Sequence, residues 1–505
     1  MKFGNLRWLH WLLAAVFALH WLLGAAMGMS VDEAHYALYA AHPALSYFDH
    51  PPLVGWVQWP LVALHMPDAM LRVVPGLLWL ATALGVYGLA VRLHAKTTAN
   101  ATNPQAAGLW AVLVWTLAPL AHILGIGLLP DTLLMAWTVA LMHLTLTLID
   151  PIQVRRSAPW LKLGLLLGLA GLSKYTAVLP AVAVAACLLR VHGMRLLGNP
   201  RLWMAAGLAL LMITPVIVWN AQNQWVSFTY QSQHGAGGTW HIQHVLQFLL
   251  VQLLAYGPLL LWGLVGLGQQ VGAPQRWLLL FFAVPFLLLA YLSGGGTSLP
   301  HWTAPAWVAL APFAGGALAA AVQTRARYGV LALVAVQAIL CAALPALMVM
   351  GGVPFWTAKA PTSASTPNPF ADLHGWEQAG ARARVLAAQQ NLRSVSVQNW
   401  TLASRLGWYA RPMPVYDLED RFDQFDLWAG DLPPGAATLL VDWSEMAYAT
   451  PFGEHGFSDC QLLEVLPVQR LGRPLSEFRF YNCQGWSGKP APRLQSELAA
   501  QGATP

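Results

Sequence analysis

Long apolar runs dominate the first 350 residues, and mixed sequence follows them. Each run has about the 17–25 residues that a helix needs to cross a bilayer. This pattern predicts a polytopic α-helical membrane protein with about 11 transmembrane helices. The predicted spans are 8–28, 70–91, 106–123, 132–149, 160–172, 175–190, 202–219, 245–267, 277–292, 302–321 and 328–350.

One stretch, from Trp160 to Arg190, is too long for a single span and short for two. A single tilted helix here would move every later loop to the opposite side of the membrane. Two short helices that meet at Ser173 and Lys174 keep the basic loops together, so we predict a break at this point.

Basic residues follow the alternation of the spans. With a cytoplasmic N-terminus, 13 of the 15 Lys and Arg residues in positions 1–350 fall on the inner side, and only Arg72 and Lys174 fall outside. The positive-inside rule therefore explains the net charge of +6 without a nucleic-acid partner. We expect a multi-pass protein of a bacterial cytoplasmic (inner) membrane, with its C-terminal domain on the periplasmic or extracellular face.

The C-terminal part has a different composition, with 12 basic and 15 acidic residues after position 350. Its pattern predicts a helix at 376–391 and strands at 394–398, 438–442, 461–469 and 478–483. It shows no nucleophile motif, phosphate loop or metal pattern, which favours a covering or acceptor-recognition domain. The predicted organisation is a transmembrane domain (1–350), a Pro/Ser/Thr-rich linker (351–370), a small α/β domain (371–488) and a disordered tail (489–505).

Composition makes the few acidic residues of the membrane part informative. The chain is 57% hydrophobic and 10% charged, and positions 1–350 hold six carboxylates, of which five fall outside. In the first outer loop, Ser30 and Glu33 form a capping-box pattern, so Glu33 either caps a helix or contacts substrate. Asp32 lies in the first turn, where the helix dipole favours its charge and suits a base or a cation ligand. Tyr36 and Tyr39 predict that this helix lies on the membrane interface.

Further along the outer side, Asp49 and His50 precede two prolines that fix an extended turn. This turn is either a binding element or an interfacial turn with a solvated carboxylate. Arg72 is either an ion-pair partner of Asp68, four residues earlier, or a phosphate ligand.

Two charged residues next to predicted spans are candidates for anion chemistry. Asp131 either caps its helix or belongs to a site, and both roles are compatible. Lys174 has apolar neighbours on both sides, and a lysine at membrane depth indicates function by default. The alternative for Lys174 is snorkelling to lipid head groups.

A polar, glycine-containing loop at 220–244 carries His234, His241 and His244. Three histidines allow a divalent metal, for which Asp49 and His234 are the candidate ligands, but the spacing matches no strong zinc pattern. Head-group contacts are the alternative. No cofactor follows with certainty.

Four cysteines occur in the chain. Cys187 and Cys341 lie in apolar spans and act there as small apolar side chains. Cys460 and Cys483 lie in the C-terminal part and can pair in an oxidising compartment. The sequence leaves that pairing open.

The motifs in their order resemble the bacterial members of the dolichyl-phosphate-mannose protein mannosyltransferase superfamily, the group that includes the aminoarabinose transferase of lipid A. The resemblance covers nearly the whole chain. It is carried by DEAHY (32–36), YFDHPPLVGW (47–56), LPDTLLMAW (129–137), GLSKYTAV (171–178), PVIVWNAQNQWVSF (215–228), QSQHG (231–235) and LPHWTAPAW (299–307).

This resemblance implies a GT-C fold and the inverting transfer of a sugar from a polyprenyl-phosphate donor to a lipid or glycan acceptor of the lipid A or lipopolysaccharide kind. It gives Asp32 and Asp131 catalytic roles and places Lys174 and His234 near the donor phosphate or a metal. Glu33, Asp49, His50, Arg72 and His301 complete the expected binding set. His50 departs from the family, because the aminoarabinose transferase has Glu-Lys at the positions of Asp49 and His50.

Two other functions stay open. A transporter or flippase for lipid-linked sugars predicts ionisable residues at mid-membrane and an internal repeat, whereas the polar residues here sit at span ends. A protein O-glycosyltransferase differs only in its acceptor. A plain membrane anchor would leave Asp32, Asp49, Asp131 and Lys174 unexplained.

Overall fold

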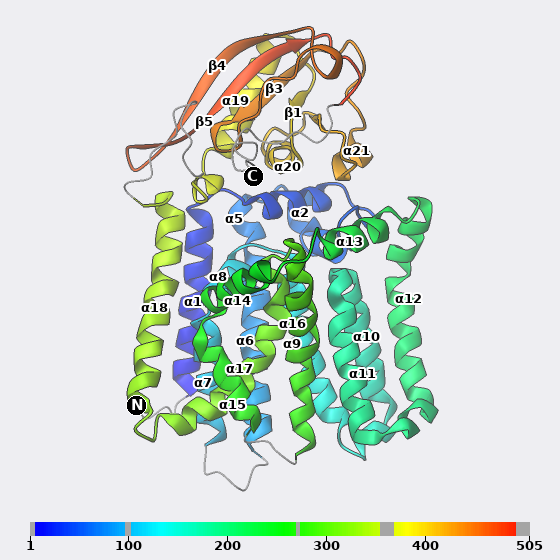
Figure 1. Ribbon diagram of the computed structural model, residues 1–505, viewed down its shortest axis with the longest axis vertical. Coiled ribbons are helices and arrows are strands. Elements are labelled where there is room, and N and C mark those ends of the chain that lie inside the picture. Colours follow the sequence, from blue (N-terminus) through cyan, green and yellow to red (C-terminus); the bar gives the residue numbers. More distant parts are fainter. Residues whose placement is uncertain (1–5, 96–102, 269–272, 354–367, 491–505) are drawn as a thin grey trace. The chain divides into compact units, whose positions relative to one another are not determined.

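The computed structural model describes residues 6–95, 103–268, 273–353 and 368–490. The chain divides into two compact units, which are described separately (Figure 1). The helical unit comprises Met1–Leu22 and Pro43–Leu344, and the mixed unit comprises Leu23–His42 and Pro345–Pro505. The predicted division at 350 therefore differs in one respect, because Leu23–His42 joins the C-terminal part. Most of the predicted linker and tail lies outside the described residues.

The helical unit consists of helices that range from single turns to more than six turns. Within it, α10 packs against α9 and α12, and α17 packs against α6, α7 and α15. Its main helices are α1 (Leu6–Ala25, which continues into the mixed unit), α6 (Val73–His94), α7 (Pro104–Thr116), α8 (Pro119–Ile126), α9 (Pro130–Leu148), α10 (Ser157–Ser173), α11 (Val178–His192), α12 (Pro200–Gln222), α13 (Val226–Ala236), α14 (Ile242–Tyr256), α15 (Trp262–Gly268), α16 (Leu280–Leu292), α17 (Ala304–Ala321) and α18 (Arg327–Met350, which also enters the mixed unit). Short α-helices connect them: α3 (Leu53–Trp56), α4 (Trp59–Ala63) and α5 (Asp68–Leu71).

Among the described residues, eight helices are long and apolar enough to cross a membrane, and two bent pairs raise the number to ten. The predicted span at 160–172 corresponds to α10, a shorter apolar helix of 17 residues. The eight are Arg7–Ala25, Asp68–His94, Pro130–Leu148, Tyr175–His192, Pro200–Gln222, Pro274–Gly295, Pro300–Ala321 and Arg327–Met350. The prediction of a polytopic helical membrane protein is confirmed.

Two predicted spans are broken rather than continuous. The run at 106–123 bends by 76° between α7 and α8, and the run at 245–267 bends by 99° between α14 and the segment from Pro258. Pro119 and Pro258 follow the breaks, and a proline lacks the N–H that would continue the helix. Gly257 supplies the left-handed backbone at the second break, with φ of 77°.

The break predicted at Ser173 and Lys174 is confirmed. Helix α10 ends at Ser173, Lys174 has extended backbone angles, and a 3-10 turn at Tyr175–Ala177 leads into α11. By contrast, the predicted loop 220–244 contains helix α13 and the start of α14. That loop prediction was wrong in its centre, where Val226–Ala236 forms a helix despite its polar sequence.

In the mixed unit, a five-stranded sheet has the order β2-β1-β3-β5-β4. The first three strands are parallel, and β5 and β4 add an antiparallel hairpin. The strands are β1 (Val395–Val397), β2 (Val415–Asp417), β3 (Thr438–Trp443), β4 (Asp459–Arg470) and β5 (Arg473–Gln484), and the helices are α2 (Val31–Ala41), α19 (Trp376–Gln389), α20 (Trp400–Tyr409) and α21 (Gln424–Trp428). The predicted α/β domain is confirmed, although β2, α20 and α21 were not predicted.

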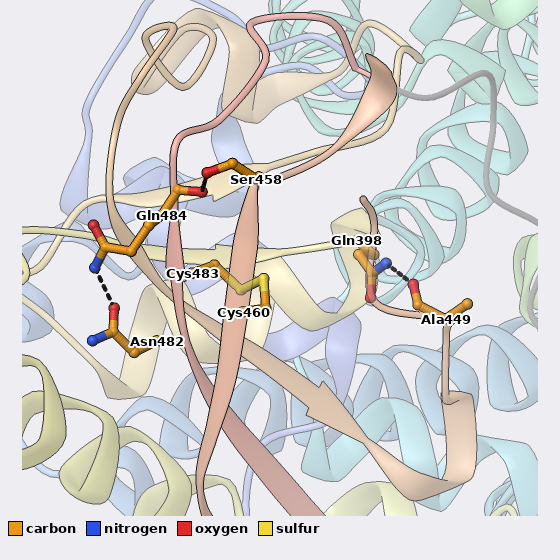
Figure 2. Close-up of a disulfide and its surroundings, with 7 residues drawn as sticks. All are labelled: Gln398, Ala449, Ser458, Cys460, Asn482, Cys483 and Gln484. Carbon is orange, nitrogen blue, oxygen red and sulfur yellow. Dashed lines mark hydrogen bonds between the residues drawn. A yellow bond between two sulfur atoms is a disulfide. The ribbon is translucent and has the colours of Figure 1, made fainter. Parts of the chain in front are cut away.

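A disulfide joins the two strands of this hairpin (Figure 2). Cys460 and Cys483 are directly opposite in the β4–β5 register, and Cys483 is fully buried. The hairpin loop consists of Leu471 and Gly472, both at positive φ, which matches a two-residue type I′ turn. The disulfide thus links β4 and β5 at one end of the hairpin, and the turn links them at the other end.

Helix α2 belongs to the mixed unit because it packs against α20. His35 Nδ1 lies 3.0 Å from the Ser404 hydroxyl, and the backbone N–H of Met29 donates to the Tyr409 hydroxyl at 2.9 Å. Tyr36 and Tyr39 are buried. The prediction that α2 lies on a membrane surface is therefore corrected, since its aromatic face is covered by protein.

Candidate functional site

The centre of the candidate site in the helical unit is an ion pair between Lys174 and Asp131. The Lys174 ammonium donates to both carboxylate oxygens of Asp131, at 2.7 and 2.6 Å. Their side chains are only 5% and 2% exposed. A buried pair is stable only with close geometry, and this one has two short contacts. Lys174 reaches Asp131 because the break between α10 and α11 frees its backbone from the helix.

The helix start at Asp131 differs from the capping prediction. The N-cap of α9 is Leu129, and Asp131 lies in the first turn. There the helix dipole favours its negative charge. The Thr132 hydroxyl lies 3.3 Å from the Leu129 N–H and donates to the Leu124 carbonyl at 3.1 Å. The Asp131 carboxylate is therefore directed to Lys174 rather than to the helix end.

Two further side chains lie near this pair. His301 Nε2 lies 3.7 Å from Asp131 Oδ2, and the Lys174 ammonium lies 5.6 Å from the centre of the Trp302 ring. Both residues belong to a 3-10 turn at Pro300–Thr303. The structure thus brings together three residues predicted from the sequence, Asp131, Lys174 and His301, and adds Trp302. At this distance the Trp302 ring can attract the ammonium through a cation–π interaction.

A groove of about 480 Å³ runs along α9 between α6 and α10. Leu78, Trp137 and Leu166 contribute to its mostly apolar lining, and Arg92 and Lys162 also line it. The Trp137 indole donates to the Ser173 hydroxyl at 3.1 Å, next to Lys174 in the chain. One residue of the groove lining is therefore hydrogen-bonded to the neighbour of Lys174 in the chain.

The Asp49 turn is held by α13. Gln231 donates to the Asp49 carbonyl at 2.6 Å, and the Ser227 hydroxyl donates to the Tyr47 carbonyl at 2.9 Å. The ring centres of Phe48 and Tyr230 are 4.6 Å apart. The two prolines and these contacts fix the backbone of the turn. The motif QSQHG thus supports the turn through Gln231.

Two glycine-containing segments meet beside α14. The Gly238 N–H donates to Gly295 and the His241 N–H to Gly294, both at 2.9 Å. A Cβ on Gly237, whose φ is 66°, would lie 2.6 Å from the Gly295 carbonyl oxygen. His244 Nδ1 lies 3.0 Å from the Gly294 carbonyl. This histidine therefore has a structural partner.

The predicted metal ligands Asp49 and His234 stay a prediction. His234 belongs to α13, but its side chain lies outside the described part of the structure. Within the described residues, the candidate metal cluster is elsewhere: Asp417, Glu419 and Asp423 in the mixed unit. The sequence shows no metal pattern in the C-terminal domain, but the fold brings these three carboxylates together.

Asp32 lies in the mixed unit beside a buried arginine. Arg405, on α20, forms an ion pair with Asp372, and its side chain is 2% exposed. Burial lowers the pKa of Arg405, whereas the charges of Asp372 and Asp32 raise it. The guanidinium lies over the rings of Trp376 and Trp443, at 4.3 and 5.5 Å. Arg405 thus balances the negative charge of Asp32 and Asp372.

Of the remaining predicted residues, Glu33 and Arg72 are both buried. Glu33 accepts from the Ser30 N–H and hydroxyl at 3.0 Å, and its own N–H donates back to Ser30 at 3.4 Å. The capping box is confirmed, which favours the structural alternative for Glu33. Arg72 lies at the junction of α5 and α6.

Sequence reasoning missed Arg405, Asp372 and Trp302. Trp302 lies next to His301 in LPHWTAPAW, so the motif itself contained the signal. Arg405 lies in ASRLGWYARP, a segment with a charged residue among apolar ones. Nothing in the sequence connects Arg405 with Asp32, because 373 positions separate them (405 − 32).

Comparison with known proteins agrees with this architecture. Residues 49–219 match the family model described as dolichyl-phosphate-mannose-protein mannosyltransferase. The crystal structure of ArnT from Cupriavidus metallidurans in the apo state aligns with a TM-score of 0.62 and 15% identity over 96% of this chain and 99% of that one. The protein therefore has an ArnT-like GT-C fold, and the predicted resemblance is confirmed.

More particular relatives follow from the same comparisons. The structure of the same ArnT bound to undecaprenyl phosphate aligns with a TM-score of 0.61 and 15% identity, covering 97% of this chain and 100% of that one. Two proteins of Rhizobium johnstonii are similar in sequence. Lipid A galacturonosyltransferase RgtD is 24% identical over 55% of this chain, and lipopolysaccharide core galacturonosyltransferase RgtA is 30% identical over 42%. The matches span 58% and 41% of these relatives.

Proposed function

We propose that this protein is an inverting glycosyltransferase that moves a sugar from a polyprenyl-phosphate donor to a lipid or glycan acceptor on the outer face of the cytoplasmic membrane. The observation that carries the proposal is the buried Asp131–Lys174 pair beside His301 in an ArnT-like fold. Burial of the charged Lys174 ammonium in an apolar unit costs free energy, so the presence of this lysine indicates a function.

Lys174 has the role of holding the phosphate of the donor. The leaving group is a phosphate, which carries negative charge readily and needs no general acid. It needs positive charge placed where the negative charge develops. Asp131 orients the ammonium through two hydrogen bonds, and His301 can add a hydrogen bond. Trp302 excludes water on one side of the ammonium.

The proton of the acceptor hydroxyl goes to Asp32. The acceptor oxygen forms the new bond to the anomeric carbon while the bond from that carbon to the phosphate oxygen breaks, and its electron pair stays on the phosphate. Asp32 interacts electrostatically with Arg405, and its carboxylate is the group that can accept the proton. Asp32 belongs to the mixed unit, so its role is proposed independently of the Lys174 role.

Two observations support the choice of donor. The groove along α9 has the apolar lining that a polyprenyl chain requires, and one of its lining residues, Trp137, donates to Ser173 next to Lys174. The names of RgtD and RgtA point to a galacturonosyl group, and the lipid A and core acceptors in those names point to lipopolysaccharide. We therefore propose a uronic acid as the first sugar to test and an aminopentose as the second.

The test uses the purified full-length protein in proteoliposomes with polyprenyl-phosphate galacturonic acid or aminoarabinose and lipid A or core acceptors. Mass spectrometry should detect a covalent glycolipid product. Equilibration of the donor across the bilayer without any product would instead support the flippase alternative. An inactive wild-type protein with every donor and acceptor would remove the proposal.

Two variants test the assigned roles in the same assay. Asp32→Asn should reduce turnover by at least about 100-fold, a size typical of losing a general base. Full activity of this variant would remove the base from the mechanism. The control is Asp150→Asn, which makes the same change at the carboxylate predicted to face the inner side and leaves the ion pair intact.

A further inference from the structure

Three carboxylates meet in the mixed unit at the end of strand β2. Asp417 is the last residue of β2, and Asp423 is the N-cap of α21. One ligand oxygen from each of Asp417, Glu419 and Asp423 lies within 4.8 Å of the others. The cluster lies at the carboxyl end of a parallel strand, where the chain turns away from the sheet and leaves room for a ligand.

Two of the three carboxylates are buried, and Asp417 is half-buried. Glu419 and Asp423 are each 5% exposed. Arginine or lysine side chains often neutralise such groups, and Arg421 and His35 contribute positive charge to Asp423 while Asp426 opposes it. Three neighbouring negative charges repel one another, and burial raises the cost of keeping them charged.

A second observation points to a ligand. One oxygen of Asp423, Oδ1, accepts from the Phe425 N–H at 2.6 Å, but Oδ2 has no hydrogen-bond partner within the described residues. The same holds for Oδ2 of Asp417. Buried carboxylate oxygens nearly always find a donor or a cation. Two such atoms directed into one cluster therefore indicate a missing positive partner.

We propose that Asp417, Glu419 and Asp423 form a binding site for a divalent cation, with calcium as the preferred ion. The donors are all oxygen atoms, which suits calcium or magnesium and not zinc. Two oxygen ligands of one calcium ion lie at most about 5 Å apart, because each bond is about 2.3–2.6 Å. The observed spacing fits within that limit, whereas magnesium requires a tighter octahedron.

The ion would hold together the segment that supports α2. Helix α21 begins at the cluster, and its side chains Phe425 and Trp428 have ring centres 6.2 and 6.1 Å from His35. His35 belongs to α2, three residues after Asp32. The inference goes beyond sugar transfer, since an ion here binds and stabilises the mixed unit whatever reaction the protein catalyses.

The competing arrangement is a set of shared protons. Burial, followed by the charges of Asp423 and Glu419, raises the pKa of Asp417 well above its usual range. Without a cation, the cluster would therefore bind protons more readily than solvent-exposed carboxylates do. Neutral variants distinguish the two arrangements, because they remove a cation ligand but mimic a protonated carboxyl group.

The experiment titrates calcium chloride into the full-length protein in a neutral detergent after removal of metal by a chelator. Isothermal titration calorimetry gives the affinity, and terbium luminescence sensitised by tryptophan gives an independent readout, since Trp428 lies on α21. Saturable binding of one ion, with magnesium at least about tenfold weaker, is the expected result. Absence of saturable binding in the wild-type protein would overturn the site.

Matched variants locate the ion. Asp423→Asn keeps an oxygen that can cap α21 but removes the charge, and Glu419→Gln is a second variant that leaves the cap intact. Both should weaken calcium binding at least tenfold and abolish the calcium-dependent rise in melting temperature. Asp420→Asn, an exposed position in the same loop, is the control and should bind as the wild type does. Equal binding by all three variants would overturn the assignment, as would a higher melting temperature of both cluster variants with no calcium effect in the wild type.

Discussion

Lys174 and Arg405 are both buried cations, and the chain satisfies them in different ways. Lys174 directs its ammonium to both oxygens of a single carboxylate at 2.6–2.7 Å. Arg405 serves Asp372 and the charge of Asp32, and its Nε and Nη1 atoms have no hydrogen-bond partner within the described residues. We call Lys174 and Asp131, in the helical unit, the closed pair, because both carboxylate oxygens accept from one ammonium. We call Arg405, in the mixed unit, the shared cation, because it interacts with two carboxylates and has N–H groups without a hydrogen-bond partner among the described residues.

This difference teaches what each cation can do. The closed pair can bind an anionic ligand only if the Lys174 ammonium rearranges or extends its contacts. Binding therefore depends on the geometry of the pair, and loss of the pair should destabilise the helical unit. An arginine that lies over two tryptophan rings is fixed by these contacts as well as by charge. Arg405 can therefore orient a neighbouring carboxylate and still leave that carboxylate open to other partners.

The largest effect is expected from breaking the closed pair. Lys174→Gln leaves the Asp131 charge buried and unpaired, which should destabilise the helical unit by about 3–5 kcal/mol. Transfer activity should fall at least about 100-fold because the phosphate loses its cation. Thermal unfolding in detergent and the proteoliposome assay measure the two effects.

The control for this variant is the double change Asp131→Asn with Lys174→Gln. It removes both charges, so stability should return towards the wild-type value while activity stays low. A stable double variant with normal activity would show that the pair has only a structural role.

The next effect is expected from the shared cation. Arg405→Met should destabilise the mixed unit by about 3 kcal/mol, at the lower end for a buried pair because Asp372 is 28% exposed. Hydrogen exchange of α2 should accelerate, since its contact with α20 is weakened. Arg405→Lys should recover part of the stability through charge but little of the stacking.

The same variant has a predictable pH dependence. Burial already raises the pKa of Asp372, and the Arg405 charge is the main factor that lowers it. Without Arg405 the folded state retains a proton on Asp372 to higher pH than the unfolded state does. The stability that this proton gives is present at low pH and is lost as pH rises through the folded-state pKa. Arg405→Met should therefore lose less stability at pH 5 than at pH 8, and equal losses would contradict the assignment.

A smaller effect is expected from the disulfide, which affects only the mixed unit. Cys460→Ser with Cys483→Ser opens a loop with a sequence separation of 23 residues and should cost about 3 kcal/mol at most, because the hairpin turn closes the same strands. Non-reducing thermal unfolding compares this variant with the wild type. Cys187→Ala, a change at a free buried cysteine, is the control for removing a thiol.

The smallest effect is expected at the start of α2. Glu33→Ala removes half of the capping box and should cost about 1 kcal/mol. If Glu33 has only this role, activity at saturating substrate should stay within a few-fold of the wild type. A loss comparable to that of Asp32→Asn would instead restore Glu33 to the substrate-binding set.

The sequence by itself determined the helical class, the break at Lys174, the capping box at Ser30 and most strands of the C-terminal domain. These features depend on neighbours a few residues apart: apolar runs of membrane length, a charge inside such a run, and a side chain that reaches its own helix end. The motif order also identified the fold, and it placed Asp131, Lys174 and His301 in one expected set.

Only the tertiary structure decided which distant residues meet. It assigned Leu23–His42 to the same unit as the C-terminal part, placed Arg405 beside Asp32, and gathered Asp417, Glu419 and Asp423. The physical reason is that charge compensation acts through space: a buried charge selects a partner by distance and geometry, and sequence separation does not restrict that choice. The bends after Thr116 and Tyr256 show the same limit, because hydropathy records how apolar a segment is and not whether its axis is straight.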